Sequence, residues 1–220
     1  MYHHIGKEDD GNPSDYFVSD EMFAKHLDFL LAENYNPVSL SDVESAYFKK
    51  TKLPERAVLL TFDDGYSNNY EYAFPLALSR KIPITIFVNA GEINMKDGML
   101  DWSQVQEMAN SGFVRFASHG MSHRNLRQMD YSEAISELLL SRTWLHHLSQ
   151  SDVRSFCYPY GAFDKQVREW VFEAGFRLDF GTRKGINAWP WTGRRPLKRL
   201  HIMRGDSLED FSNQLRRGKK

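Results

Sequence analysis

The sequence predicts an α/β fold with a largely parallel sheet, formed as a single domain over residues 1–220. Strand-like apolar runs alternate with amphipathic, helix-like segments along the chain. Repeated β-then-α units imply parallel strands joined by right-handed crossovers. About seven such strands fit a complete or nearly complete α/β barrel better than a small open sheet. A doubly wound open sheet is the alternative, since periodicity alone does not separate the two. No repeat, low-complexity tract or linker divides the chain.

Capping residues and apolar spacing predict the elements of the N-terminal half. We expect His3 and His4 in a first strand. Ser19 can cap a helix that starts at Asp20, with one apolar face made of Phe23, Leu27, Leu30 and Leu31. Strands are expected over 36–40, over the near-continuous apolar run 57–62, and over the β-branched run 82–90. The helix between the last two covers about 67–80, with Pro75 as a kink or restart.

The C-terminal half continues the same alternation. Glycines just past a helical pattern mark two helix ends, Gly112 after a helix that starts at 102 and Gly175 after a helix over 164–174. The remaining predicted elements are strands over 113–118, 154–158, 176–181 and 198–203, and helices over 132–148 and 207–216.

Composition excludes several classes of function. The formal net charge is −1, so electrostatic binding to nucleic acid is not expected. Cys157 is the one cysteine, so no intrachain disulfide can form. No stretch is long enough for a membrane span, and the first residues lack the pattern of a signal peptide. We expect a cytoplasmic protein if the chain is complete, and a cell-envelope or secreted one if an upstream export signal has been removed.

Polar residues stand where predicted strands end. Asp63 and Asp64 come directly after "AVLLTF", His119 comes directly after "FVRFAS", and His123 follows four residues later. The third such motif, "PYG" at 159–161, follows "RSFCY". Parallel α/β folds place active sites at the C-terminal ends of their strands, where the loops converge. The three motifs are therefore expected to meet on one face.

One carboxylate and two imidazoles are a suitable ligand set for a divalent metal such as zinc. Three protein ligands leave one coordination position open, which is typical of a catalytic site. The cation also removes the penalty for two adjacent ionised carboxylates. One aspartate can then bind the metal while the other acts as a base. Zinc lowers the pKa of its bound water from about 15.7 to roughly 7, so the residues indicate a metal-assisted hydrolase.

In this order and at these separations, "TFDDG", "SHGMSH" and "YPYG" resemble the polysaccharide deacetylase family, the NodB-type domain of carbohydrate esterase family four. The opening "MYHHI" and the closing "RLHIMRGDSLEDF" are similar to members that act on N-acetylglucosamine polymers. The resemblance implies a distorted (β/α)7 barrel. It also implies metal-dependent removal of N-acetyl, sometimes O-acetyl, groups from a glycan.

Carried over by position, the resemblance assigns roles to single residues. Asp63 corresponds to the catalytic base. The metal ligands are Asp64, His119 and His123, with zinc as the expected ion and cobalt, nickel or manganese as alternatives. The metal and the backbone N–H of Tyr160, which also contacts substrate, stabilise the oxyanion. His201 in "RLHIM" is the candidate general acid, and a satisfied core histidine is the competing interpretation.

The chain departs from the family pattern at two places. At the position of Cys157, many members have an arginine that orients the base. In this chain another side chain orients Asp63, or none does. The tryptophan-bearing fourth motif is not evident after "YPYG". We consider Trp102, Trp189 and Trp191 as residues that could line a sugar cleft, although loop or helix packing explains each of them as well.

Three hypotheses for function follow. The preferred one is a zinc-type de-N-acetylase that acts on a glycan containing N-acetylglucosamine. The absence of the family's arginine motivates a second hypothesis, a carbohydrate-binding barrel without turnover. The third is a hydrolase of a small cyclic amide or a formylated amino sugar. The sequence indicates a glycan as partner and does not indicate an oligomeric state.

Overall fold

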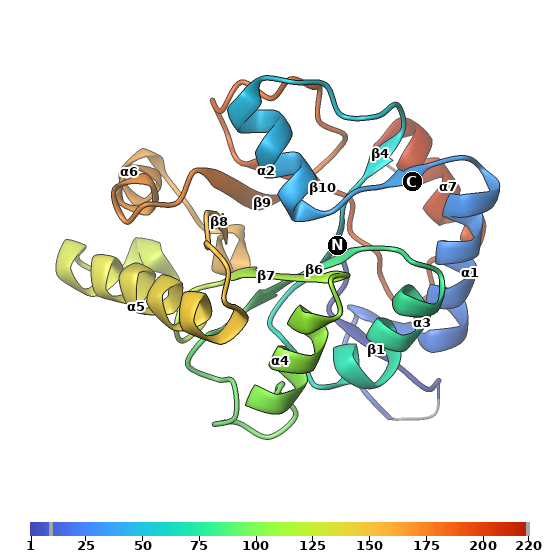
Figure 1. Ribbon diagram of the computed structural model, residues 1–220, viewed down its shortest axis with the longest axis horizontal. Helices are drawn as coiled ribbons and strands as arrows, with labels where there is room; N and C mark the ends of the chain where they lie inside the picture. The colour runs from blue at the N-terminus through green and yellow to red at the C-terminus, as the bar shows by residue number, and fades with distance from the viewer. Residues whose placement is uncertain (9–10, 219–220) are drawn as a thin grey trace.

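The computed structural model describes residues 1–8 and 11–218. Its main sheet has six parallel strands in the order β10-β9-β8-β7-β6-β5, and the helices surround it (Figure 1). The strands are β5 (Leu60–Phe62), β6 (Ile84–Val88), β7 (Val114–Ser118), β8 (Ser155–Cys157), β9 (Leu178–Lys184) and β10 (Leu197–Arg199). The order follows the sequence in reverse, as consecutive right-handed βαβ crossovers require.

Residues Met1 and Tyr2 close this curled sheet into a barrel. On one side, the amide of Tyr2 donates to the carbonyl of Thr61 at 2.8 Å, and the amide of Asp63 donates to the carbonyl of Tyr2 at 3.0 Å. On the other side, the nitrogen of Met1 donates to the carbonyl of Leu200, just after β10, at 2.7 Å. The predicted α/β class is confirmed, and the arrangement is that of a distorted (β/α) barrel.

Side chains of the strands alternate between two apolar clusters. Ile86 of β6, Phe116 of β7 and Phe156 of β8 pack in the cluster that includes residues of helices α1, α4, α5 and α6. Their neighbours Phe87, Ala117 and Cys157 lie in a second cluster with Leu178, Phe180 and Leu197. Because successive residues of a strand point to opposite faces, both faces of the sheet are buried.

The described residues form seven α-helices around the sheet, and five of them begin within one residue of the predicted start. They are α1 (Asp20–Ala32), α2 (Leu40–Lys49), α3 (Phe74–Ser79), α4 (Trp102–Asn110), α5 (Tyr131–Ser149), α6 (Lys165–Glu173) and α7 (Leu208–Arg217). The hydroxyl of Ser19 caps α1 as expected. A π-helical turn, Asn69–Ala73, precedes α3, and Pro75 lies in the first turn of α3. None of the described helices combines the length and hydropathy that a bilayer span requires.

Several local predictions were wrong. The strand expected over 36–40 is limited to β3 (Asn36–Pro37), and Ser39 instead forms a capping box with Asp42 that starts the unpredicted helix α2. The run 57–62 is divided between β4 (Ala57–Val58), which pairs with β3, and β5 of the barrel. Leu31 is 46% exposed, because it lies at the edge of the apolar stripe of α1, whose buried members include His26.

The ends of the barrel sheet also differ from expectation. The strand predicted over 198–203 ends at Arg199, so His201 lies beyond β10. The chain before α1 forms a small parallel pair, β1 (His4–Gly6) with β2 (Phe17–Ser19). His4 therefore belongs to β1, whereas His3 directly precedes it.

Candidate metal centre

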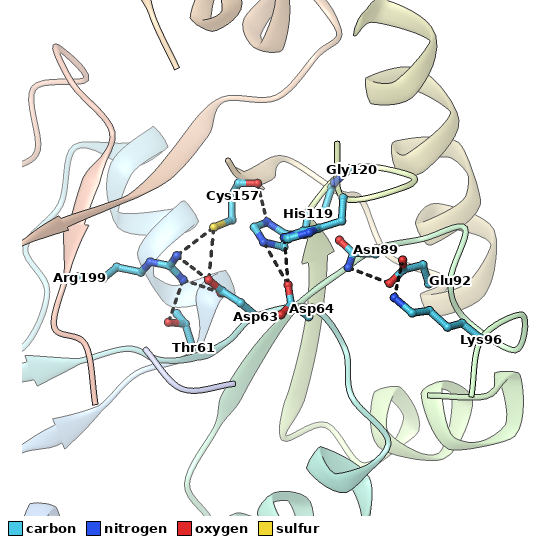
Figure 2. Close-up of polar contacts among 12 residues, drawn as sticks. Thr61, Asp63, Asp64, Asn89, Glu92, Lys96, His119, Gly120, Cys157 and Arg199 are labelled. Carbon is cyan, nitrogen blue, oxygen red and sulfur yellow. Dashed lines mark hydrogen bonds and ion pairs between the residues drawn. The ribbon is translucent and has the colours of Figure 1, made fainter. Parts of the chain in front are cut away.

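The strand-end residues gather at one place, as the parallel fold requires. Asp63 and Asp64 directly follow β5, and His119 directly follows β7. Figure 2 shows His119 approaching Asp64, while Arg199 reaches Asp63 from another side. The side chains of Asp63, His119 and Arg199 are more than nine-tenths buried, and that of Asp64 is 12% exposed.

Three side chains form a group that can hold a metal. Nε2 of His119 lies 3.5 Å, and Nε2 of His123 lies 3.3 Å, from the same oxygen, Oδ1 of Asp64. Ligands about 2.0–2.1 Å from a tetrahedral zinc are about 3.3 Å apart, so these separations match. Oδ1 of Asp64 is buried and has no hydrogen-bond partner among the described residues, which is costly unless a cation is bound. The donor set and its spacing therefore fit a divalent metal.

A backbone contact sets the orientation of His119. Its Nδ1 lies 2.8 Å from the carbonyl oxygen of Cys157, which can only accept a hydrogen bond. Nδ1 therefore carries the proton, and the lone pair of Nε2 faces Asp64. Burial lowers the pKa of His119, against the opposing effect of the carboxylates of Asp63 and Asp64. The ring is thus neutral, as a metal ligand must be.

Three residues at the site have a left-handed backbone. The φ angles are 74° for Asp64, 53° for His123 and 60° for Tyr160. Each costs of order 1–3 kcal/mol unless surrounding contacts hold it, and such strain is concentrated at functional sites. Gly65 continues the turn at φ 88°, and a Cβ at that position would lie 2.8 Å from Cγ1 of Val88. The turn after β5 therefore needs a glycine and aims Asp64 at the two histidines.

Glu137 of α5 holds the loop between the two histidines. Its Oε1 accepts hydrogen bonds from the amides of Met121 at 2.8 Å and Ser122 at 2.6 Å, and its carboxylate also accepts from the hydroxyl of Ser122. The sequence pattern did not predict a role for this residue. Its signal is an acidic residue on the buried face of a helix, beside Ala134 and Leu138.

Asp63 is held in a buried ion pair with Arg199. Nη1 of Arg199 lies 2.6 Å from Oδ1 of Asp63, and Nη2 lies 2.7 Å from Oδ2. Burial by itself would raise the pKa of Asp63, but the guanidinium of Arg199 lowers it well below its usual range. The carboxylate is therefore ionised.

Asp63, His119 and Cys157 form a second group with metal-ligand spacing. We regard it as the weaker candidate for two reasons. The guanidinium of Arg199 already occupies both oxygens of Asp63 and repels a cation. Burial also raises the pKa of the Cys157 thiol well above its ordinary value, whereas only the thiolate is a good ligand.

Tyr160 borders the open side of the triad formed by Asp64, His119 and His123. It lies in the short 3₁₀ turn Pro159–Gly161, its side chain is 67% exposed, and its ring centroid is 4.6 Å from that of His123. Beside it is a polar cavity of about 550 Å³, lined by Ser122, His123, Arg124, Asn125, Gln128 and Tyr160. A larger cavity of about 780 Å³ is lined by none of the triad residues and extends from Tyr35 to Arg199.

The predicted general acid, His201, has another partner. Its Nε2 lies 2.6 Å from the carbonyl oxygen of Thr182, and no contact within residues 1–8 and 11–218 joins it to the triad. Burial lowers the pKa of His3, for which the sequence predicted no catalytic role, although the nearby carboxylates of Asp63 and Asp64 each raise it. Nδ1 of His3 is buried without a described hydrogen-bond partner. The signal was the histidine pair of "MYHHI".

The three tryptophans considered for a sugar cleft each make a packing contact. Trp102 stacks on Trp144 of α5, with ring centroids 5.5 Å apart. Nε1 of Trp191 donates to the carbonyl of Arg195, and Nε1 of Trp189 donates to that of Thr51. No contact in the described part of the chain joins these three rings to the triad. These contacts agree with the packing interpretation, and contact of the rings with a glycan stays a prediction.

Known proteins share this sequence pattern. A family model described as polysaccharide deacetylase matches residues 50–178. Over 211 residues the chain is 26% identical to YxkH of Bacillus subtilis (strain 168), covering 96% of this chain and 73% of the relative. It is 28% identical over 177 residues to the poly-beta-1,6-N-acetyl-D-glucosamine N-deacetylase of Staphylococcus aureus (strain MRSA252), covering 75% of this chain and 61% of that enzyme. The match thus covers less than two thirds of the staphylococcal protein.

Solved structures share the fold. IcaB from Ammonifex degensii superposes with a TM-score of 0.82 at 26% identity, over 100% of this chain and 95% of the other. The deacetylase PplD of Streptococcus pyogenes, solved with acetate, gives a TM-score of 0.89 at 23% identity, over 98% and 96% of the two chains. The second likeness is one of fold alone.

Proposed function

Because the chain belongs to the polysaccharide deacetylase family of hydrolases, we propose that it removes acetyl groups from a glycan containing N-acetylglucosamine, in a metal-dependent reaction. One observation carries the proposal. Asp64, His119 and His123 converge on a single point, and Asp63, held by Arg199, is adjacent. This arrangement provides a metal site and a separate base, as metal-assisted hydrolysis requires.

Asp64, His119 and His123 are the proposed ligands, and zinc is the proposed ion, with cobalt, nickel or manganese as alternatives. A bound divalent metal would supply a Lewis acid and a water molecule of lowered pKa. The buried, neutral His119 and the unpaired oxygen of Asp64 prepare the chain for that ion. Glu137 holds the loop that carries His119 and His123.

Different residues of the chain then carry out separate steps of the hydrolysis. Asp63 accepts the proton of the attacking water while the new C–O bond forms at the acetyl carbonyl carbon. The backbone N–H of Tyr160 stabilises the oxyanion of the tetrahedral intermediate. A general acid protonates the leaving nitrogen as the C–N bond breaks, and the products are acetate and a free amine.

We assign the general acid to His3 rather than to His201. The effect of both Asp63 and Asp64 on the pKa of His3 supports a place beside the reacting groups. Nε2 of His201 is engaged by Thr182.

We propose that residues 1–220 act as one deacetylase domain on a polymeric glycan. The polar cavity beside Tyr160, with its amide and guanidinium donors, supports a substrate longer than one sugar. The hypothesis of a binding barrel without turnover loses its motivation, because Arg199 supplies the arginine that position 157 lacks. No contact of the described residues favours a small cyclic amide or a formylated amino sugar.

The test measures acetate release from oligomers of β-1,6-linked N-acetylglucosamine, chito-oligosaccharides, peptidoglycan and acetylxylan. We expect release from at least one N-acetylated glycan, loss of release after chelation, and recovery after zinc is added. Asp63→Asn should lower kcat by about 10²–10⁴-fold. Undiminished turnover in that variant would contradict the role of Asp63. Saturable glycan binding with no acetate release would support the non-catalytic barrel.

A further inference from the structure

We propose that Asp179 is a positioning residue for the oxyanion: it holds Tyr158, and through Tyr158 it holds the turn that carries the backbone N–H of Tyr160. The proposal rests on the deacetylase function above, in which that N–H stabilises the tetrahedral intermediate. It starts from a buried carboxylate that the mechanism does not use. Asp179 lies in β9 with its side chain fully buried, and it belongs neither to the triad nor to the Asp63–Arg199 pair.

Two partners satisfy the carboxylate of Asp179. The hydroxyl of Tyr158 donates to Oδ2 of Asp179 at 3.0 Å. Burial raises the pKa of Tyr158 well above its ordinary value, so this hydroxyl keeps its proton and remains a donor. Arg168 of α6 forms a bidentate pair with the same carboxylate, in which Nε lies 2.6 Å from Oδ2 and Nη2 lies 3.1 Å from Oδ1. Such pairs add geometric specificity to their energy.

Arg168 is itself immobilised by further partners. Its Nη1 donates to the carbonyl of Arg194 at 2.8 Å, and its Nη2 donates to that of Gly193 at 2.6 Å. Both carbonyls belong to the segment between β9 and β10. The guanidinium carbon also lies 5.0 Å from the ring centroid of Phe172. Contacts with β9, α6 and this segment therefore hold Arg168, and Asp179 orients Tyr158 from a fixed position.

Tyr158 joins the ion pair to the turn at Tyr160. Its side chain is fully buried, and its amide donates to the carbonyl of Phe180 in β9 at 3.1 Å. Its own carbonyl accepts from the amide of Gly161 at 2.8 Å and closes the 3₁₀ turn Pro159–Gly161. β9 therefore holds Tyr158 through both the backbone and the side chain, and a rotation of Tyr158 would move the turn.

The turn needs support because its backbone is unfavourable. Tyr160 has φ 60° and ψ 5°, a left-handed conformation that persists only when surrounding contacts hold it. Gly161 lies tightly against β9, because a Cβ at that position would be 1.9 Å from Oγ1 of Thr182. Tyr160 itself is 67% exposed, so its own side chain gives little anchorage. The neighbours of Tyr160 must supply it, and Tyr158 does so through a buried polar contact.

Stability alone does not account for an ion pair at this depth. Taking two charges out of water is costly, and well-packed apolar side chains of similar volume are often at least as stabilising. What the bidentate pair adds is a fixed direction for the Tyr158 hydroxyl. An oxyanion donor acts through preorganisation, so a small displacement of the turn lowers the rate. The network of Tyr158, Arg168 and Asp179 therefore fits a positioning role.

Tyr158→Phe in the full chain tests the proposal, because it removes one hydroxyl and keeps the buried ring and the Asp179–Arg168 pair. We expect kcat to fall about 10–100-fold, somewhat less than the loss caused by removing an oxyanion donor outright. KM and zinc content should stay unchanged, since the N–H acts in the transition state. Tyr70→Phe is the matched control. The hydroxyl of Tyr70 donates to Oε2 of Glu107 at 2.7 Å in an exposed pair, so its loss should leave kcat unchanged.

A comparison of two substrates separates positioning from a loss of folded protein. In a glucosamine oligomer that carries N-trifluoroacetyl groups, fluorine withdraws charge from the oxyanion, so hydrolysis depends less on the Tyr160 N–H than in the N-acetyl oligomer. The ratio of the two rates in one preparation does not depend on the folded fraction. We expect the ratio of trifluoroacetyl to acetyl turnover to rise at least about threefold in Tyr158→Phe and to stay unchanged in Tyr70→Phe. An unchanged ratio in Tyr158→Phe, or an undiminished kcat, would overturn the positioning role.

The backbone amide of Tyr160 gives a readout that needs no turnover. In protein with isotope-labelled tyrosine, the Tyr160→Phe variant identifies the NMR signal of this amide. We expect Tyr158→Phe to shift the signal and to speed its hydrogen exchange about tenfold, the effect of losing one hydrogen bond to a charged group. An unchanged signal would contradict the anchoring of the turn. If the parent protein releases no acetate from any glycan, the proposed function fails, and the amide signal still decides whether Tyr158 holds the turn.

An apolar variant keeps the test decisive if Tyr158→Phe folds poorly. Tyr158→Phe combined with Arg168→Met and Asp179→Leu removes the three polar partners together. Replacing a whole buried network by apolar groups of similar shape is often neutral or stabilising, so this variant should fold and bind zinc. Its kcat should be lowered at least as far as that of Tyr158→Phe, because nothing then fixes the direction of the turn. A folded, zinc-bound triple variant with the kcat of the parent protein would count against the proposal.

Discussion

The carbonyl oxygen of Cys157 accepts a hydrogen bond from Nδ1 of His119 at 2.8 Å, and this contact fixes which ring nitrogen faces Asp64. A strand of the barrel thereby orients a side chain that follows the neighbouring strand. The position of the imidazole is set by the fold before any ion binds. The candidate metal site is therefore preorganised, and its parts can be tested one at a time.

Substitution of the two candidate acids, His3 and His201, should lower kcat to very different extents. His3→Asn should lower kcat by about 10²–10⁴-fold, because the leaving amine then lacks its proton donor. His201→Asn should change kcat far less, since Nε2 of His201 is already engaged by Thr182. Steady-state kinetics with zinc content measured for both variants separates these roles. A larger loss in His201→Asn would return the acid role to that residue.

Removing the charge of Glu137 should weaken metal binding without touching a ligand. Glu137→Gln exchanges a charged acceptor for a neutral amide opposite the amides of Met121 and Ser122, so the loop of the two histidines loosens. Changes in residues that orient metal ligands typically cost 10–100-fold in affinity, and we expect a loss in that range by zinc titration. Glu133→Gln on the same helix is the control, because glutamine also suits that capping position. Equal affinities in the two variants would contradict the anchoring role.

Stability should fall as the pH drops below about 6.5, and buried histidines are the reason. Burial lowers the pKa of His26 from 6.5 to about 4, with Nε2 left without a described partner. Between these values the unfolded chain binds more protons than the folded one, so the unfolding free energy decreases toward acid pH, by up to about 3 kcal/mol for this group. Urea unfolding at pH 7 and pH 4.5 measures the effect. His26→Leu should reduce the difference between the two pH values, whereas changing the exposed His147 to leucine should not.

The polar cavity beside Tyr160 should matter more for long substrates than for short ones. Arg124→Ala and Gln128→Ala remove hydrogen-bond donors from its wall. We expect KM to rise about fivefold or more for a tetrasaccharide, because each variant loses about one hydrogen bond to the substrate. KM should stay unchanged for a monosaccharide derivative. Arg127→Ala is the matched control, because Arg127 faces Asp164 and does not line the cavity. An equal effect on both substrate lengths would argue against a subsite.

Local signals in the sequence predicted most of the elements. The rule that active sites lie at the C-terminal ends of parallel strands predicted where the chemistry lies. Ser19 and the glycines at 112 and 175 mark helix ends through contacts with their own neighbours, so they can be recognised without the fold. Asp63, Asp64 and His119 were predicted to meet because each follows a buried strand. That rule needs only the order of strands and helices.

Contacts across the barrel could not be predicted in this way. Arg199 was expected only as part of a strand, because nothing local says that its side chain crosses the interior to Asp63, 136 residues away. The position of His201 depended on where β10 ends, and the roles of Met1 and His3 depended on how the barrel closes. These relationships are properties of the closed sheet rather than of a segment.

Zinc titration of metal-free protein by calorimetry tests the central claim, that Asp64, His119 and His123 hold one divalent ion. We expect one high-affinity site in the parent protein and none in Asp64→Ala, His119→Ala or His123→Ala, while His147→Ala binds as the parent does. Undiminished zinc binding in any of the three ligand variants, or no binding by the parent protein, would contradict the account.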